Sequence, residues 1–183
     1  MTADPAPGST GRPRLAVCPG SFDPVTAGHV DVVRRATVLF EAVVVAVVRN
    51  HSKATLFDAT ERAELIRASL AGDPATARVR VDVVEDGLIA DYAADVGAVA
   101  LVKGLRSGTD FAYEVPMALM NRHLRGVETV FVPGDQRYDH VSSSMIKEVA
   151  RLGGDVAPFV PPPVLGPLLA RVREGDGPAP RPR

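Results

Sequence analysis

The sequence predicts an α/β protein whose core is a doubly wound parallel sheet of five strands with helices on both faces. Short runs rich in Val, Ala and Leu alternate with longer segments of helical periodicity, which is typical of strand–helix–strand units. Two of these runs, Ala42–Val48 and Ala98–Val102, are apolar throughout, as expected of interior strands covered on both faces. Right-handed crossovers would join such units into a Rossmann-like sheet.

The strands are expected, in chain order, at Arg14–Cys18, Ala42–Val48, Val79–Val84, Ala98–Val102 and Thr129–Val132. The first helix is expected over 28–40, because Val30, Val33, Thr37 and Phe40 recur three or four residues apart and so share one face.

The second helix, over 59–71, has the same periodicity and follows a capping pair, Asp58 and Glu61, of the kind that begins helices. Further helices are expected over 88–96, about 110–124, 142–152 and 163–174. Pro116 falls inside 110–124, where it removes one main-chain hydrogen bond and is expected to bend the helix.

Length and composition indicate one globular domain. The chain has 183 residues, against a typical value of about 150 residues per domain, and the expected domain covers 13–174. Residues 1–12 and 175–183 are rich in Pro and Gly and poor in apolar side chains, so both are expected to be disordered tails.

Charge, hydropathy and cysteine content exclude several classes of protein. The net charge of −1 argues against a domain that binds nucleic acid, which normally carries a basic excess. The longest apolar run, Ala42–Val48, is far shorter than the roughly 20 residues of a membrane helix. A single cysteine, Cys18, leaves no disulfide framework or multi-cysteine zinc site. The first residues lack the apolar core of a secretory signal, so a cytoplasmic protein without membrane or nucleic-acid partners is expected.

The segment after the first strand, PGSFDPVTAGHVD at 19–31, carries the strongest functional signal. In doubly wound sheets ligands bind beyond the carboxyl ends of the strands, and the free N–H groups at a helix start attract phosphate. The segment lacks the GxGxxG of redox dinucleotide folds and the Gly-Lys-Ser/Thr of P-loops. Instead, Thr26-Ala27-Gly28-His29 places an imidazole in the first helical turn, beside the expected phosphate site.

Several blocks of sequence resemble one enzyme family. Gly20–Pro24 followed by Thr26–His29 is similar to the (His/Thr)-x-Gly-His signature of the nucleotidylyltransferase superfamily. The blocks KGLR at 103–106, DFAYE at 110–114, MNRHL at 120–124 and VSSSMIKE at 141–148 narrow the likeness. Together they resemble the phosphopantetheine adenylyltransferase family of bacterial coenzyme A synthesis, from about Arg14 to Arg173.

The resemblance implies a reaction and a set of site residues. ATP and 4′-phosphopantetheine, with magnesium, would give dephospho-coenzyme A and pyrophosphate in a homohexamer. The acceptor phosphate would attack the α-phosphate of ATP in line, without a covalent enzyme intermediate, and His29 is the implied catalytic donor to that phosphate. The residues implied to bind ATP are Ser21, Phe22, His29, Gly104, Leu105, Arg106, Glu114, Tyr138, Asp139, His140, Val141, Ser142, Ser143 and Ser144. Those implied to bind the acceptor are Ser21, Lys53, Leu88, Ile89 and Lys103.

Two of these residues depart from the family pattern. Lys103 stands where the family usually has Arg, and Ser21 stands where it often has Thr. Asp23, before Pro24, is expected to organise the turn rather than to bind substrate. Cys18 is expected to be a buried strand residue, because a reactive thiol would need a basic partner.

Three alternatives remain at this point. Another nucleotidylyltransferase, acting on nicotinamide mononucleotide or on a sugar or glycerol phosphate, would share the first loop. A non-catalytic nucleotide-binding module would keep that loop but lose His29, Lys53 or Arg106, and all three are present. A redox Rossmann domain is disfavoured by the missing GxGxxG.

Overall fold

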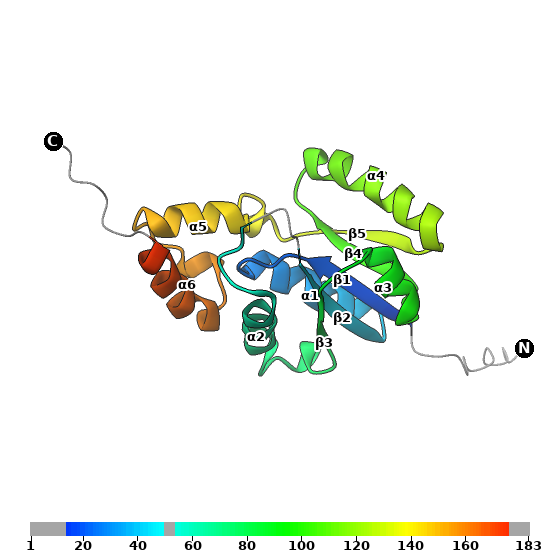
Figure 1. Cartoon of the computed structure of the whole chain (residues 1–183), viewed down its shortest axis with the longest axis horizontal. Coiled ribbons are helices and arrows are strands. Elements are labelled where there is room, and N and C mark those ends of the chain that lie inside the picture. Colours follow the sequence, from blue (N-terminus) through cyan, green and yellow to red (C-terminus); the bar gives the residue numbers. More distant parts are fainter. Residues whose placement is uncertain (1–13, 50–53, 176–183) are drawn as a thin grey trace, which may run out of the picture.

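Five parallel strands form one sheet in the order β3-β2-β1-β4-β5. The computed structural model describes residues 14–49 and 54–175 (Figure 1). The strands are β1 (Leu15–Gly20), β2 (Ala42–Val48), β3 (Arg80–Val84), β4 (Ala100–Leu105) and β5 (Glu128–Pro133). The predicted fold class is therefore confirmed.

Within the described residues, six α-helices connect and flank these strands: α1 (Ala27–Leu39), α2 (Ala59–Leu70), α3 (Ile89–Asp95), α4 (Gly108–Arg125), α5 (Ser143–Arg151) and α6 (Pro162–Gly175). Short 3₁₀ helices lie at Pro74–Thr76, Gln136–Tyr138 and Ala157–Phe159. The predicted capping pair of α2 is present, since Asp58 accepts from the N–H of Glu61 and Glu61 accepts from that of Asp58. Such reciprocal bonds satisfy N–H groups that a helix start leaves without partners.

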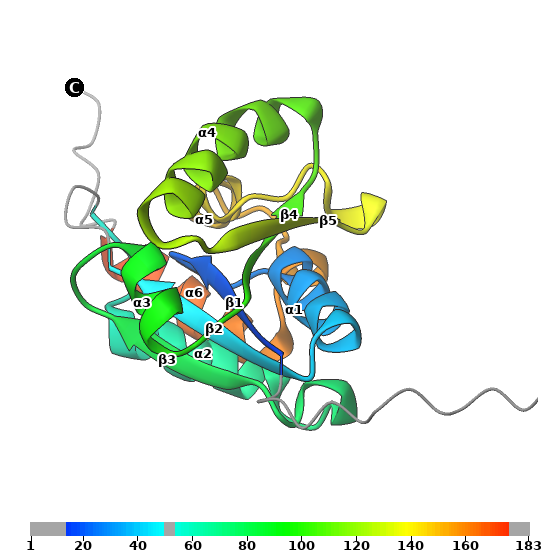
Figure 2. The same ribbon diagram turned by 90° about the vertical axis from the view of Figure 1, so that its right-hand side faces the viewer.

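The sheet is buried on both faces, as the apolar run of β2 predicts. Val43, Val45 and Val47 point into the larger core, together with residues of α1, α2, α5 and α6. Val44 and Ala46 point into a smaller core on the other face, against α3. Figure 2 shows α1 and α3 on opposite sides of the strands. This alternation follows from the two-residue period of a strand.

The central strand β1 divides its side chains in the same way. Ala16 and Cys18 join the larger core, and Val17 joins the smaller one. Cys18 is 4% exposed, and burial raises the pKa of its thiol to about 12. The prediction of a buried cysteine on this strand is confirmed.

Most elements differ from the sequence-based boundaries by one or two residues, and the difference is largest at β4. The fourth strand was expected at 98–102, but β4 begins at Ala100 and continues to Leu105, because Lys103 and its neighbours pair with Phe131–Pro133 of β5. The hydropathy of the sequence does not indicate these main-chain hydrogen bonds between strands. The helix that contains Pro116 begins at Gly108 and continues through the proline to Arg125.

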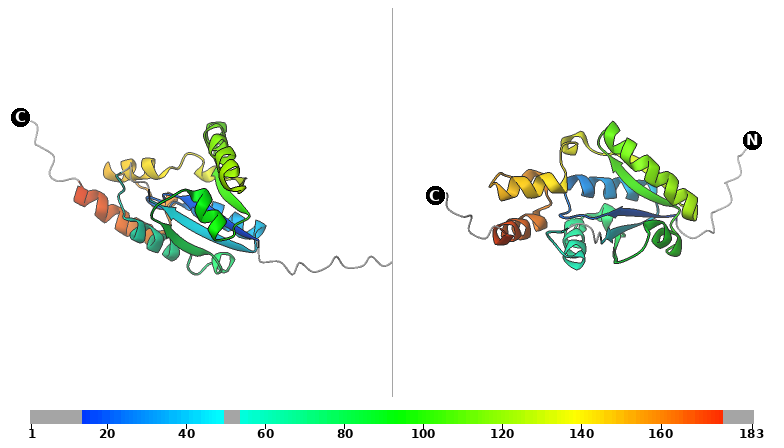
Figure 3. Two further views of the ribbon diagram at one scale, coloured as in Figure 1. Left: turned by 45° about the vertical axis from the view of Figure 1, so that its right-hand side comes forward. Right: turned by 45° about the horizontal axis from the view of Figure 1, so that its top comes forward.

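Helix α4 lies on the outside of the molecule (Figure 3), and only its Asn121 is buried. No described helix is both long and apolar enough to cross a membrane. The expected tails lie outside the described residues, apart from Gly175, which ends α6.

Candidate active site

A cavity of about 380 Å³ opens at the carboxyl ends of β1 and β4. These strands are neighbours, and the chain leaves them in opposite directions, toward β2 and toward β5. Ligands of doubly wound sheets bind where strand order reverses in this way. The cavity brings together many of the predicted site residues, namely Ser21, Phe22, His29, Lys103, Gly104, Leu105, Arg106, Glu114, Tyr138, Val141, Ser142 and Ser143.

His29 is fixed by the capping box that begins α1. The Thr26 hydroxyl accepts from the N–H of His29, and the main-chain N–H of Thr26 donates to Nδ1 of His29 over 3.0 Å. A main-chain N–H can only donate, so Nδ1 is the acceptor and the ring proton lies on Nε2. No described residue accepts a hydrogen bond from Nε2–H. Since His29 lines the cavity, this N–H can donate to a ligand there.

The environment keeps this imidazole neutral. Burial lowers the pKa of His29 to about 4, and the positive charges of Arg106 and Lys103 act in the same direction. The ring of Phe22 lies edge-on to it, with centroids 5.1 Å apart. Phe22 is 6% exposed, belongs to the larger core and also lines the cavity, so its packed ring helps to fix the position of His29.

Two cations enter the cavity from the end of β4, and each is held by a carboxylate of α4. Lys103 Nζ lies 3.3 Å from Glu114, and Arg106 Nε donates to Asp110 over 2.9 Å. Arg106 also donates to the carbonyl of Val141 over 2.7 Å. The cations are therefore oriented before any ligand binds, which lowers the cost of ordering them around an anion.

Cavity carboxylates are all paired with cations. The pairs are Asp110 with Arg106, Glu114 with Lys103, and Asp135 with Arg137. Within the described ranges, no group of three or more His, Cys, Asp or Glu side chains is placed to hold a metal ion.

The far wall of the cavity is the segment between β5 and α5. The Cβ of Tyr138 would lie 3.2 Å from a β-carbon added at Gly28, so the segment packs closely on the start of α1 and leaves little room there. The main-chain N–H of Asp135 donates to Asp31 of α1 over 3.1 Å. Ser142 caps α5 by accepting from the N–H of Met145, and Arg106 donates to the carbonyl of the preceding residue, Val141.

Some predicted residues of this segment lie elsewhere. Asp139, His140 and Ser144 are exposed and do not line the cavity. The ring of His140 packs edge-on against Phe159 instead. Ser143 lines the cavity, but its hydroxyl donates to the carbonyl of Pro24 over 2.8 Å, which ties α5 to the first loop.

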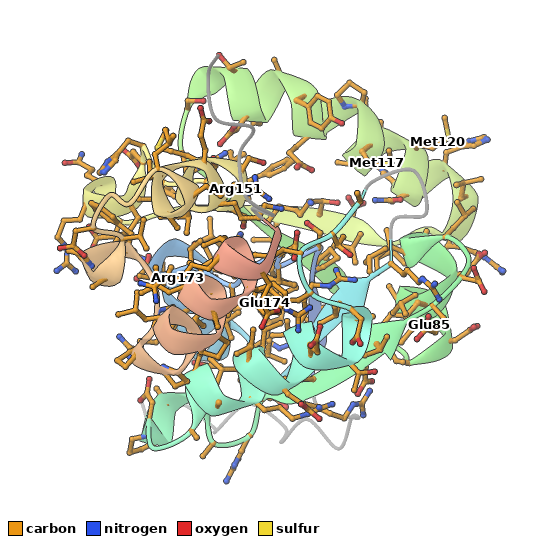
Figure 4. All side chains as sticks on the ribbon, turned by 60° about the vertical axis from the view of Figure 1, so that its left-hand side comes forward. Glu85, Met117, Met120, Arg151, Arg173 and Glu174 are labelled. Atoms are coloured by element: carbon orange, nitrogen blue, oxygen red, sulfur yellow. The ribbon has the colours of Figure 1, made fainter. Side chains whose placement is uncertain are left out.

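The predicted acceptor residues are only partly gathered at the cavity. Leu88 is the N-cap of α3 and is 53% exposed, while Ile89 packs against the smaller core, and neither lines the cavity. Lys53 lies outside the described residues. Arg151, a cation near the end of α5 that is not among the predicted acceptor residues, is exposed and does not line the cavity (Figure 4).

Three residues that position parts of the site are not among the predicted site residues: Thr26, Asp31 and Arg62. Thr26 belongs to the motif, and its spacing from His29 is that of a capping box, so this role had a sequence signal. Asp31 and Arg62 act on main-chain groups of distant segments, at Asp135 and Ser21 respectively, and no local pattern indicates such bonds.

Comparisons with known proteins place the chain in a family. Residues 17–149 match the cytidylyltransferase-like family model. The phosphopantetheine adenylyltransferase of Kocuria rhizophila is 60% identical over 155 residues, which make up 85% of this chain and 97% of that protein. The protein of the same name from Micrococcus luteus is 56% identical and covers 83% of this chain and 95% of its own length.

A solved structure supports the fold alone. The nicotinic acid mononucleotide adenylyltransferase of Plasmodium falciparum, complexed with NaAD, has a TM-score of 0.64 at 13% identity. The match covers 88% of this chain and 95% of that one. On the identity and coverage of its relatives, the chain belongs to the phosphopantetheine adenylyltransferase family of nucleotidyltransferases.

Proposed function

We propose that this protein transfers the adenylyl group of ATP to 4′-phosphopantetheine, giving dephospho-coenzyme A and pyrophosphate. The observation that carries the proposal is the convergence in one cavity of His29 from α1, Lys103 from β4 and Arg106 directly after β4. Two anionic substrates need such a concentration of donors and cations to approach each other. The names of the relatives support the choice of acceptor.

The chemistry needs no base on the enzyme. The second pKa of a phosphate monoester is about 6, so the acceptor phosphate is largely dianionic at pH 7. One of its oxygens forms a bond to the α-phosphorus of ATP in line, and the bond from that phosphorus to the bridging oxygen of pyrophosphate breaks. No covalent enzyme intermediate is formed, and the enzyme contributes position and charge stabilisation.

His29 is proposed to donate its Nε2–H to the α-phosphate. The fixed tautomer and the lowered pKa support this role, because the ring stays a hydrogen-bond donor without being charged. Lys103 and Arg106 supply the positive charge instead. A preorganised donor aimed at charge that develops in the transition state is among the larger catalytic contributions.

The two substrates are proposed to divide the cavity between them. ATP would lie toward Glu114, Arg106 and the wall formed by Tyr138, Val141 and the serines, whereas the acceptor phosphate would lie at Ser21, Lys53 and Lys103. Leu88, an exposed apolar side chain, and Ile89 would contact the pantetheine arm. The family resemblance supports these assignments.

Magnesium is proposed to enter as the ATP complex. This ion binds mainly to substrate phosphates and water, with one or two protein carboxylates. The cavity carboxylates already neutralise neighbouring cations, so a phosphate-bound ion fits these residues better than a dedicated protein cage. When bound, the ion would neutralise charge on the leaving pyrophosphate.

We also propose a cytoplasmic homo-oligomer, by resemblance a hexamer. Helix α4 exposes several large apolar side chains, and Figure 4 labels two of them, Met117 and Met120. The exposed residues are Phe111, Tyr113, Met117, Leu119, Met120 and Leu124. A patch of this kind on one helix is typical of a protein–protein contact. Light scattering after size exclusion would test the hexamer, and a monomer at micromolar concentration would refute it.

The experiment that tests the reaction is release of pyrophosphate from ATP with and without 4′-phosphopantetheine. We expect release only with this acceptor, and mass spectrometry should identify dephospho-coenzyme A. Nicotinamide mononucleotide and glycerol phosphate serve as competing acceptors. Faster release with either of them would refute the proposed acceptor while keeping the nucleotidyltransferase chemistry.

A further inference from the structure

Arg62 is a buried cation that the proposed chemistry does not use. Its side chain extends from α2 to Ser21, in the loop that follows β1, and the residue is 1% exposed. Nη1 donates to the carbonyl of Ser21 over 2.5 Å and to that of Val48 over 3.3 Å, and Nε donates to the carbonyl of Asp58 over 3.2 Å. A buried guanidinium is costly unless its N–H groups find acceptors. Here one side chain holds together the end of β2, the start of α2 and the loop that follows β1.

The bond to Ser21 also determines the orientation of the next N–H group. Among the described residues only the Asp23–Pro24 peptide is cis, so the peptide between Ser21 and Phe22 is trans. The C=O and N–H of a planar trans peptide point in opposite directions. Because Arg62 holds the Ser21 carbonyl on its own side, the N–H of Phe22 points away from Arg62. Both Ser21 and Phe22 line the cavity.

Phe22 has a backbone conformation that requires support. Its φ is +50°, in the left-handed region that a residue with a β-carbon rarely adopts and that persists only where the surroundings fix it. Arg62 fixes the preceding residue. Asp23, which is 4% exposed, fixes the following one, since its carboxylate accepts from the N–H groups of Leu56 and Phe57 and from Lys147 at 2.5 Å. Buried charges therefore hold the loop on both sides of Phe22.

We propose that Arg62 is a positioning residue for the reaction: through the Ser21 carbonyl it keeps the N–H of Phe22 directed into the cavity as a preorganised donor to a substrate phosphate. The inference rests on the proposed function, since it takes the cavity to bind phosphate. Arg62 itself touches no substrate. Its effect is to fix, before binding, a donor that would otherwise have to reorganise when charge develops.

The test compares Arg62→Met and Arg62→Lys with a control on the same helix. Lysine keeps the charge but is a compact donor that cannot bind the carbonyls of three segments as a guanidinium does. We expect Arg62→Met to lower kcat and to weaken pyrophosphate binding, measured by calorimetry, by about tenfold or more each, as for loss of one preorganised donor. Arg62→Lys should lie between Arg62→Met and the unchanged protein in both quantities.

Ile66→Ala is the control for a purely structural effect. Ile66 is buried in the larger core and bonds no part of the first loop. Its truncation should lower Tm while leaving kcat and the pyrophosphate Kd unchanged at a temperature well below Tm. If Arg62→Met does not fold, Arg62→Lys decides the question.

Two results would overturn the inference. One is a folded Arg62→Lys with the kcat and the pyrophosphate Kd of the unchanged protein. The other is an Ile66→Ala that loses as much in both quantities as the Arg62 variants. Failure of the proposed function is a separate outcome, because an unchanged protein that binds pyrophosphate but does not use 4′-phosphopantetheine still allows the Kd comparison.

Discussion

The main-chain N–H of Thr26 donates to Nδ1 of His29 across 3.0 Å, and this one bond determines which nitrogen of the imidazole can serve a ligand. A histidine held in this way in the first turn of a helix has its ring proton on Nε2, so it can act only as a donor to a ligand. Because the pKa of His29 is lowered to about 4, the ring carries only this one proton at neutral pH.

Variants of His29 should show whether activity depends on having a hydrogen-bond donor at the Nε2 position. We expect His29→Ala to fold and to lose about 10²-fold or more in kcat, as for one lost transition-state donor. His29→Gln places an amide N–H near the Nε2 position and should retain more activity than His29→Asn, whose amide lies nearer Nδ1. Steady-state pyrophosphate release measures all three variants. Near-normal kcat in folded His29→Ala would remove His29 from the catalytic role.

The same residue should make stability depend on pH. In the unfolded chain the pKa of a histidine is about 6.5, whereas the pKa of His29 in the folded protein is about 4. Between these values the unfolded state binds a proton that the folded state does not, so stability is full above pH 6.5 and falls as the pH falls toward 4. The loss at pH 5 should be about 1–2 kcal/mol. Urea unfolding at pH 7 and pH 5 measures it, with His29→Gln as the non-titrating control. An equal loss in both proteins would contradict the expectation.

Lys103 should act on the acceptor more than on ATP. We expect Lys103→Ala to raise the KM for 4′-phosphopantetheine about tenfold or more, because a hydrogen bond to a charged group contributes about 1.5–3 kcal/mol. Lys103→Arg should restore acceptor binding, since a planar guanidinium can bind phosphate through two parallel bonds. Varying each substrate in turn measures both values. An unchanged KM for the acceptor in Lys103→Ala would place Lys103 outside the acceptor site, leaving it only the ion pair with Glu114.

Asp31 should affect ATP through the far wall of the cavity. Its carboxylate accepts from the N–H of Asp135 and also pairs with Arg35. We expect Asp31→Ala to raise the KM for ATP about threefold to tenfold, since a lost hydrogen bond of this kind is worth about 0.5–1.5 kcal/mol. Arg35→Ala is the matched control, because it removes the ion pair and leaves the bond to Asp135. Equal effects of the two variants would show that the bond between Asp31 and Asp135 is not the cause.

How far the sequence predicts this molecule depends on whether the interaction is local. The apolar run Ala42–Val48 and the Asp58–Glu61 pair are local signals, and the strand and the helix start that they predict are present. The carboxyl half of β4 was not predicted, because Lys103 pairs with Phe131 through main-chain bonds that hydropathy does not register.

The candidate site shows the same distinction. The motif residues His29 and Arg106 are brought to one cavity. The positions of Asp31 and Arg62 could not be predicted, because their partners are main-chain atoms 104 and 41 residues away. His140, which the resemblance implied in ATP binding, lies in the turn after the 3₁₀ helix Gln136–Tyr138 and packs against Phe159 instead, a distant contact that no local pattern indicates.

Gly104 should tolerate no β-carbon while Val32 is present. An added Cβ would lie 2.5 Å from Cγ2 of Val32, and the branched side chain has little rotamer freedom to move away. We expect Gly104→Ala to lower the free energy of unfolding by about 1–3 kcal/mol and to weaken ATP binding. Gly104→Ala combined with Val32→Ala should recover most of the stability, measured by urea unfolding.

Gly134→Ala is the matched control for this pair. Gly134 also lines the cavity, but an added Cβ there would meet its nearest neighbour, the carbonyl oxygen of Leu105, at an ordinary distance of 3.7 Å. We expect Gly134→Ala to leave stability nearly unchanged. A loss equal to that of Gly104→Ala would mean that the contact with Val32 is not the cause.

The thiol of Cys18 gives the chain a built-in reporter of opening at the centre of its sheet. It is the single cysteine of the sequence, and with a pKa of about 12 and 4% exposure it carries almost none of the thiolate that alkylating reagents attack. Iodoacetamide should therefore label the native protein only when the packing around Cys18, which belongs to the larger core and borders the cavity, opens. In excess reagent, the labelling rate measures how often this opening occurs. The opening of this part of the core can thus be followed by mass spectrometry without adding a probe.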